Sequence, residues 1–248
     1  MDRTRKKQAA IGIGILLILC AALLIYGQYQ RSQQRAEYLH LGQLDAQHIV
    51  EQSKPSGELI VEALHFTIYE SEIQLAAERN QMFYSETENL TEAALLYLTE
   101  LKAVYQTAVS EGYEVSAEEI AALVAQDREN IRETFSARNF KAYLKGMGVT
   151  EDQYWTLLLT DEQYHQDVIV DRYLDHEQEI LFERNHLDYG SDAAVKAWEE
   201  RLYQLGQQAM RKEEARIVSE QETYKSIRLF DQLNAGSRDR EQSSVGIF

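Results

Sequence analysis

The sequence predicts an all-α protein with one N-terminal membrane helix and, at most, a very small two-stranded sheet. Three observations carry this prediction. The 248 residues include one proline and twelve glycines, although strand-rich domains need both residue types for their frequent turns. Apolar residues recur at helical spacing through most of 58–234. Three Ser or Thr residues are each followed three positions later by Glu or Gln, the pattern of a capping box at a helix start.

Charge and composition exclude several classes of function. The formal net charge is −16, whereas a nucleic-acid-binding protein needs clustered Lys and Arg for its phosphate contacts. The single cysteine, Cys20, leaves no internal disulfide to form. His165 and His176 would lie about 16 Å apart on a straight helix, too far to share one metal ion. We therefore expect no metal site and no cofactor.

The N-terminus has the pattern of a membrane anchor. Residues 1–8 are basic, and 9–27 contain no charged residue. A helix of that length would be about 28 Å long, close to the thickness of bilayer hydrocarbon. The basic residues before this segment favour a cytoplasmic N-terminus, which places the rest of this single-pass protein outside the cytoplasm. An uncleaved anchor is the prediction, and small residues around Cys20 leave cleavage or lipidation open as alternatives.

A polar segment and a first strand follow the anchor. Residues 28–57 are glutamine-rich and end near Pro55 and Gly57, which is typical of a stalk. The alternating stretch ELIVEAL, 58–64, predicts a short strand. Thr67 and Glu70 form a capping-box pair, so a helix is expected from there to about Ser85.

Two longer helices are expected next. The first extends from about Asn89 to about Glu111 and ends at Gly112, the position that glycine prefers after a helix. The stretch SAEE, 116–119, is a second capping box. The helix that it starts is expected to reach about Lys145.

A glycine-containing corner then precedes another helix. Gly146 and Gly148 allow the chain to leave right-handed helical geometry, and Thr150 with Gln153 forms a third capping box. The resulting helix is expected to continue to about Glu183. The stretch NHLDYGSD, 185–192, interrupts the pattern before a last amphipathic helix. A short strand at ARIV, 215–218, and a disordered tail over 235–248 complete the prediction.

Four stretches, taken in order, resemble the SurA/PrsA-type extracytoplasmic chaperones. They are FTIYESEIQLAAE (66–78), ALLYLTELKAVYQTAVSEGYEVSAEEIAAL (94–123), FKAYLKGMGVTEDQYW (140–155) and AWEERLYQLGQQAMRKEEARIV (197–218). The resemblance covers 58–218 and implies a SurA N-terminal-like helical domain over 58–234. It also implies that the closing segment returns to the start, so that 215–218 pairs with 58–64.

The resemblance implies binding of unfolded or newly exported polypeptides in the bacterial envelope. Many relatives insert a parvulin prolyl isomerase domain before the closing helix, but only 184–192 occupy that place here. We therefore expect no isomerase activity and no other enzymatic activity. The alternative is a membrane-anchored helical scaffold that uses the same helices to recruit one specific envelope partner.

The corner at 140–164 supplies the candidate binding residues. Aromatic side chains offer contact area at low entropic cost, so they could line a cradle for clients or a partner. For any one of them, packing in the core of the hairpin is the commoner role. Tyr154 and Trp155 are adjacent on a helix, so one core face accommodates one of them, and Gly146 and Gly148 are the expected hinge. The candidates are Phe140, Tyr143, Met147, Tyr154, Trp155 and Tyr164.

Overall fold

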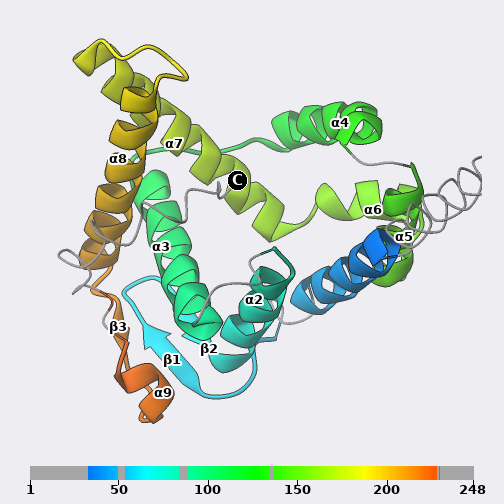
Figure 1. The fold of residues 1–248 in the computed structure, drawn as a ribbon, viewed down its shortest axis with the longest axis horizontal. Helices are drawn as coiled ribbons and strands as arrows, with labels where there is room; N and C mark the ends of the chain where they lie inside the picture. The colour runs from blue at the N-terminus through cyan, green and yellow to red at the C-terminus, as the bar shows by residue number, and fades with distance from the viewer. Residues whose placement is uncertain (1–32, 50–53, 84–88, 135–136, 228, 230–248) are drawn as a thin grey trace, which may run out of the picture.

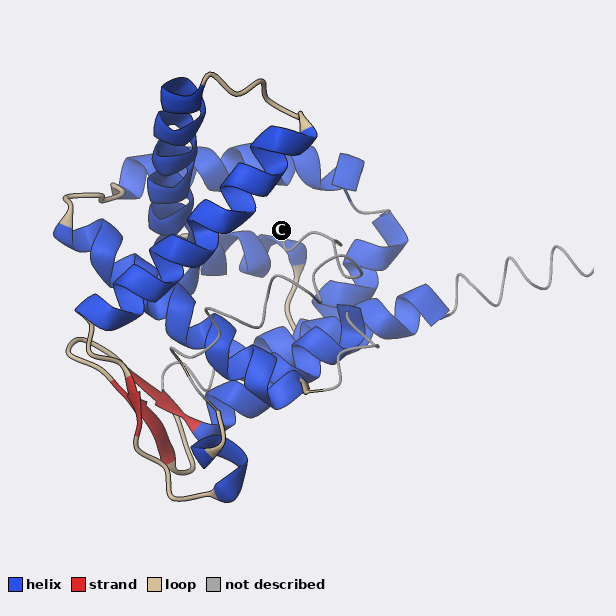
Figure 2. Ribbon diagram, turned by 60° about the vertical axis from the view of Figure 1, so that its left-hand side comes forward, coloured by secondary structure: helices blue, strands red, loops and turns tan. Residues whose placement is uncertain are grey.

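The computed structural model confirms a mostly helical protein with a very small sheet (Figures 1 and 2). It describes residues 33–49, 54–83, 89–134, 137–227 and 229. A helix over 33–49 comes first. The elements after it are β1 (Leu59–Glu62), β2 (Thr67–Tyr69), α2 (Glu70–Phe83), α3 (Leu90–Ser110), α4 (Ala117–Thr134), α5 (Ala137–Met147), α6 (Glu151–Leu158), α7 (Glu162–Asn185), α8 (Asp192–Lys212), β3 (Arg216–Ile217) and α9 (Glu222–Lys225).

The sheet has three strands in the order β2-β1-β3, with both pairings antiparallel. Val61 lies opposite Ile217, so the predicted pairing of 58–64 with 215–218 is confirmed. Strand β2 was not expected. Thr67 belongs to it, opposite Glu62, and is therefore not the predicted helix cap. Helix α2 begins three residues later, where the Glu72 carboxylate accepts a hydrogen bond from the Tyr69 backbone N–H at 2.8 Å.

Helix α3 lies in the middle of the main core. It packs against α2, α7 and α8, and the strands contribute Ile60, Val61 and Ile68 to the same cluster. Asn89 caps its start, and Gly112 follows its end with a φ of +91°, as predicted. Burial on several sides explains why α3 is rich in Ala and Leu: small side chains let neighbouring helices approach, and larger ones fill the space between them.

A second, smaller core joins α4, α5 and α6. It contains Ile120, Val124, Phe140, Leu144 and Trp155. A single helix to Lys145 was predicted, and this prediction is wrong. Val124 and Leu144 would lie about 30 Å apart on one straight helix, yet they share one cluster, so α4 and α5 are separate helices that pack in the same core.

The single helix predicted from the glycine corner to Glu183 is also two helices. The capping box at Thr150 and Gln153 is present and starts α6. Helix α7 has a start of its own, where the Asp161 side chain accepts a hydrogen bond from the Gln163 backbone N–H at 2.9 Å. The break lets α6 pack in the small core while α7 crosses to the main core.

The helix over 33–49 is packed into the fold, although its sequence predicted a polar stalk. Leu41 and Leu44 are buried. Gly42 lies against α5 so closely that a Cβ there would be 2.1 Å from the Tyr143 carbonyl oxygen. The Asp45 carboxylate accepts a hydrogen bond from Tyr143 Oη at 2.8 Å and pairs with Arg79 of α2 at 3.5 Å. This helix therefore connects the small core back to α2 (Figure 1).

The two glycines predicted as a hinge have different roles. Gly148 has a φ of +73° and follows the end of α5, as expected of a residue that leaves helical geometry. Gly146 lies inside α5, where a Cβ would be 2.0 Å from the Leu39 carbonyl oxygen. Its function is close approach of two helix backbones rather than flexibility.

The predicted anchor, 9–27, and the predicted tail, 235–248, lie outside the described residues. Within the ranges that the structure describes, no helix is both long enough and apolar enough to cross a membrane.

The contact at Gly146 gives a prediction with an unusual sign. Gly→Ala inside a helix ordinarily stabilises it by about 0.5–1 kcal/mol. Here the added methyl meets backbone that no rotamer change can move, so we expect Gly146→Ala to destabilise the protein by about 1–3 kcal/mol. Urea unfolding of the full chain in detergent, followed by circular dichroism, measures the change. The exposed Lys141→Ala in the same helix is the control, and a stabilised Gly146→Ala would contradict the close contact.

Candidate functional site

A groove lies where α2, α3, α7 and the helix over 33–49 face one another. Its cavity volume is about 300 Å³, and its lining comes from all four helices and from the connection between β1 and β2. Because these elements come from distant parts of the chain, the groove exists only in the folded protein. It is the candidate functional site.

The wall formed by α3 is largely apolar. It consists of residues spaced by three or four positions, which lie along one face of a helix: Leu98, Leu101, Lys102, Tyr105 and Gln106. Leu98 is buried, whereas Leu101 and Tyr105 are half-buried against the main core. Part of an apolar face of α3 is therefore left open to the groove.

The wall formed by α7 is polar and acidic. It has the same helical spacing and consists of Glu162, Gln163, Gln166, Asp167 and Val170. The Gln163 amide donates a hydrogen bond to the Asp167 carboxylate at 2.6 Å. The two walls thus differ in chemistry: one offers apolar contact, and the other offers amides and carboxylates.

A lysine and a histidine complete the polar part of the groove. Lys102 Nζ contacts Glu72 Oε1 at 2.7 Å and donates to the Thr67 carbonyl oxygen at 3.0 Å, which ties α3 to α2 and β2. His48 comes from the helix over 33–49. Burial lowers the pKa of His48, and the neighbouring Arg79 lowers it further, so this imidazole is neutral at pH 7.

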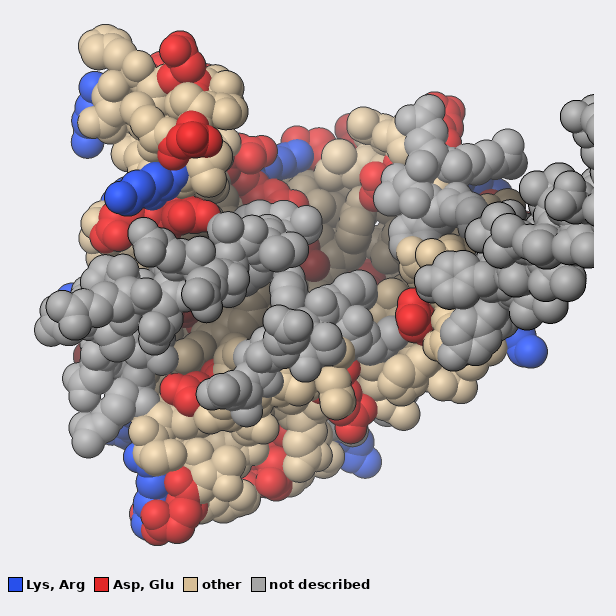
Figure 3. Space-filling model, viewed as in Figure 1, with Lys and Arg blue, Asp and Glu red and all other residues tan. Residues whose placement is uncertain are grey.

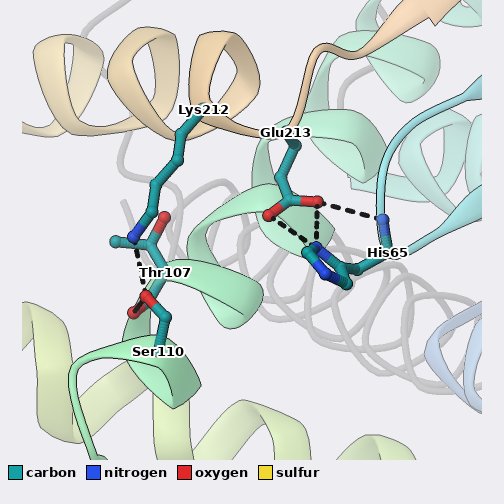
Figure 4. A network of polar contacts seen from close by, with 5 residues as sticks. All are labelled: His65, Thr107, Ser110, Lys212 and Glu213. Atoms are coloured by element: carbon teal, nitrogen blue, oxygen red, sulfur yellow. Dashed lines mark hydrogen bonds and ion pairs between the residues drawn. The ribbon is translucent and has the colours of Figure 1, made fainter.

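The edge of the groove near β1 is held by a buried carboxylate (Figure 4). Glu213, just after α8, is 4% exposed and accepts hydrogen bonds from the His65 backbone N–H and from His65 Nδ1, at 3.2 and 3.1 Å. The Leu64 backbone N–H donates to the Glu213 carbonyl oxygen at 2.9 Å. Lys212 points the other way, to Ser110 Oγ at 2.7 Å on α3. These contacts fix the turn that carries Phe66 into the groove.

Asp167 is the acid most affected by the groove. It is exposed, but it stands where surrounding protein displaces part of its hydration. This desolvation raises the pKa of Asp167 from an ordinary value near 3.8 to about 6, and repulsion from Asp171 and Asp161 adds to the shift. The hydrogen bond from Gln163 and the charge of Arg79 oppose it. Asp167 therefore changes charge near pH 6 and is mostly ionised at pH 7.

Acidic side chains are also visible on the surface near α7 and α8 (Figure 3). Lys and Arg side chains lie among them on the same face.

The aromatic residues predicted as a cradle lie elsewhere, in the small core. Phe140 and Trp155 are buried, and Tyr143 and Tyr154 pack against them with ring centroids 4.9–6.4 Å apart. Tyr164 is half-buried beside this cluster, and its hydroxyl donates a hydrogen bond to the Asp127 carboxylate of α4 at 2.7 Å.

None of the six predicted binding residues lines the groove. Met147 at the end of α5 is half-buried, and Trp155 rather than Tyr154 is the more deeply buried of the adjacent pair. A binding role for these residues stays a prediction. In the closed cluster, Phe140 and Trp155 present almost no surface to another molecule.

Sequence reasoning missed the groove because its residues have ordinary patterns. Leu98, Leu101 and Tyr105 belong to an apolar stripe that predicts core, and Glu162 and Asp167 resemble a solvated helix face. No signal in the sequence separates the part of this stripe that is open to the groove from the part that is buried. Among the described residues, no group of three or more His, Cys, Asp and Glu side chains is placed to hold a metal ion.

The raised pKa of Asp167 predicts a pH-dependent effect on stability. An acid whose pKa is raised in the folded state loses folding stability as the pH rises from about 4 to about 6, and that loss persists above pH 6. Asp167→Asn should therefore raise the Tm at pH 8 and change it much less at pH 4. Glu183→Gln, at an exposed position on the same helix, is the control. Equal shifts at both pH values would contradict the assignment.

No protein-family model matches the chain, and no curated protein or solved structure matches it at a significant level. A function for the groove therefore has to be inferred from its residues and from the sequence pattern.

Proposed function

We propose that this protein is a membrane-anchored, extracytoplasmic chaperone-like protein that binds segments of unfolded or newly exported polypeptides in the groove between α3 and α7. Binding is reversible and non-catalytic, and it needs no metal or cofactor. The helices hold the segment until it is released to fold or to pass to another protein.

The observation that carries the proposal is the partly open apolar wall of α3 opposite a wall of amides. Unfolded chains differ from folded ones in exposing apolar side chains together with unpaired backbone groups. Leu101 and Tyr105 can cover the former, and Gln166 can hydrogen-bond to the latter. A cavity of about 300 Å³ is at the small end for ligand sites, which suits a few side chains of a chain rather than a folded domain.

The rest of the sequence is consistent with such a role. The uncharged segment 9–27 would keep the domain at the membrane surface where exported chains emerge. The acidic surface would repel anionic lipid head groups and keep complexes with apolar segments soluble. Both features support a tethered binding protein, and neither requires chemistry on the bound chain.

The proposal predicts that the groove is responsible for suppression of aggregation. Full-length protein in lipid nanodiscs should reduce light scattering by an unrelated, chemically unfolded protein on dilution, relative to empty nanodiscs. The double variant Leu101→Gln and Tyr105→Gln should lose most of this effect, because it removes the apolar wall. Val109→Gln, an exposed apolar position on the same helix, should behave like the wild type once both variants are shown to be folded.

Three results would contradict the proposal. Wild-type protein that suppresses no aggregation would exclude general client binding, and binding of only one folded envelope protein would support the scaffold alternative instead. Suppression that survives the double variant would place client binding outside the groove.

A further inference from the structure

We propose that the groove selects polypeptide segments in which apolar residues are accompanied by Lys or Arg. This inference rests on the proposed function and names the class of segment that the same site binds. It follows from the different chemistry of the two walls and from the balance of charges between them.

The walls are arranged so that one segment contacts both. Leu98, Leu101 and Tyr105 follow one another along α3, and Glu162, Gln166 and Asp167 follow one another along α7. Both sets line a single cavity. A polypeptide bound between them would therefore have some of its side chains in contact with the apolar wall of α3 and the opposite ones near the carboxylates of α7. The geometry therefore suits an amphipathic segment rather than a uniformly apolar one.

The charges of the groove are not balanced. Its lining contains three carboxylates, on Glu72, Glu162 and Asp167, and one lysine. Lys102 is engaged by Glu72 and by the Thr67 carbonyl oxygen. Among the described residues, no Lys or Arg forms an ion pair with Glu162 or Asp167.

The surroundings of these two carboxylates reinforce the imbalance. Asp161 and Asp171 lie near enough to Asp167 to repel its charge. Arg79 is the cation that acts on Asp167, and it is already paired with Asp45. The groove thus holds negative charge that a bound segment can neutralise.

Lys and Arg fit this environment better than other residues. Their aliphatic stems can pack along Tyr105 or Leu101 while the charged ends reach Glu162 and Asp167. Acidic segments would instead bring like charges together, which disfavours them as partners. The groove therefore discriminates by charge among segments of equal apolarity.

Fluorescence anisotropy with three matched peptides tests the inference. The peptides share one apolar core sequence and differ in two flanking residues, which are Lys, Gln or Glu. They are titrated at pH 8 with full-length protein in nanodiscs of zwitterionic lipid, and empty nanodiscs serve as the background. We expect the Lys peptide to bind about three- to tenfold more tightly than the Gln peptide at low salt, with the Glu peptide weakest.

Variants and salt identify the groove as the source of this preference. In Glu162→Gln with Asp167→Asn, the Lys and Gln peptides should bind with equal affinity, so the ratio of their Kd values is the readout. The matched double variant Glu179→Gln with Glu183→Gln, at exposed positions farther along α7, should keep the wild-type preference. Raising the salt concentration should reduce the preference, because surface charges are then screened.

The outcomes separate this inference from the proposed function. Equal binding of all three peptides would overturn the charge preference and leave the proposed function standing. A preference that persists in Glu162→Gln with Asp167→Asn would also overturn it, because the selectivity would then arise outside the groove. Absence of binding by any peptide would overturn both proposals.

Discussion

The backbone contact between the helix over 33–49 and α5 closes the arrangement on which the groove depends. Gly42 and Gly146 let the two helices approach until a Cβ on either would overlap a carbonyl oxygen of the other. The Asp45 carboxylate then accepts a hydrogen bond from the Tyr143 hydroxyl and forms an ion pair with Arg79. This link joins α2 directly to the small core. With it, His48 is brought to the groove as its fourth side.

Local chemistry was sufficient to predict much of the fold. Helices begin at the predicted capping residues Asn89, Ser116 and Thr150. Two helices end just before glycines with positive φ, Gly112 and Gly148. These features depend on residues within a few positions of one another. The pairing of β1 with β3 was also predicted, although it joins distant segments, because the resemblance supplied the return of the closing strand.

The errors arose where contacts between distant segments decide the structure. The separation of α4 from α5 is required by their shared core, and no Gly or Pro lies between them in the sequence. Thr67 has a capping-box partner at the right spacing, but pairing with β1 takes it into a strand instead. The groove has the same origin: Leu101 and Asp167 become neighbours of one cavity only because α3 and α7 pack together.

The buried Glu213 carboxylate has a consequence for the order of assembly. A ribosome makes β1 and the His65 turn early, but their partners Glu213 and β3 come about 150 residues later. During that interval the first strand pair lacks its third strand, and one edge of the groove has no anchor. Such long sequence separation slows folding and prolongs exposure of apolar surface. A domain of this design would itself need protection until β3 has emerged.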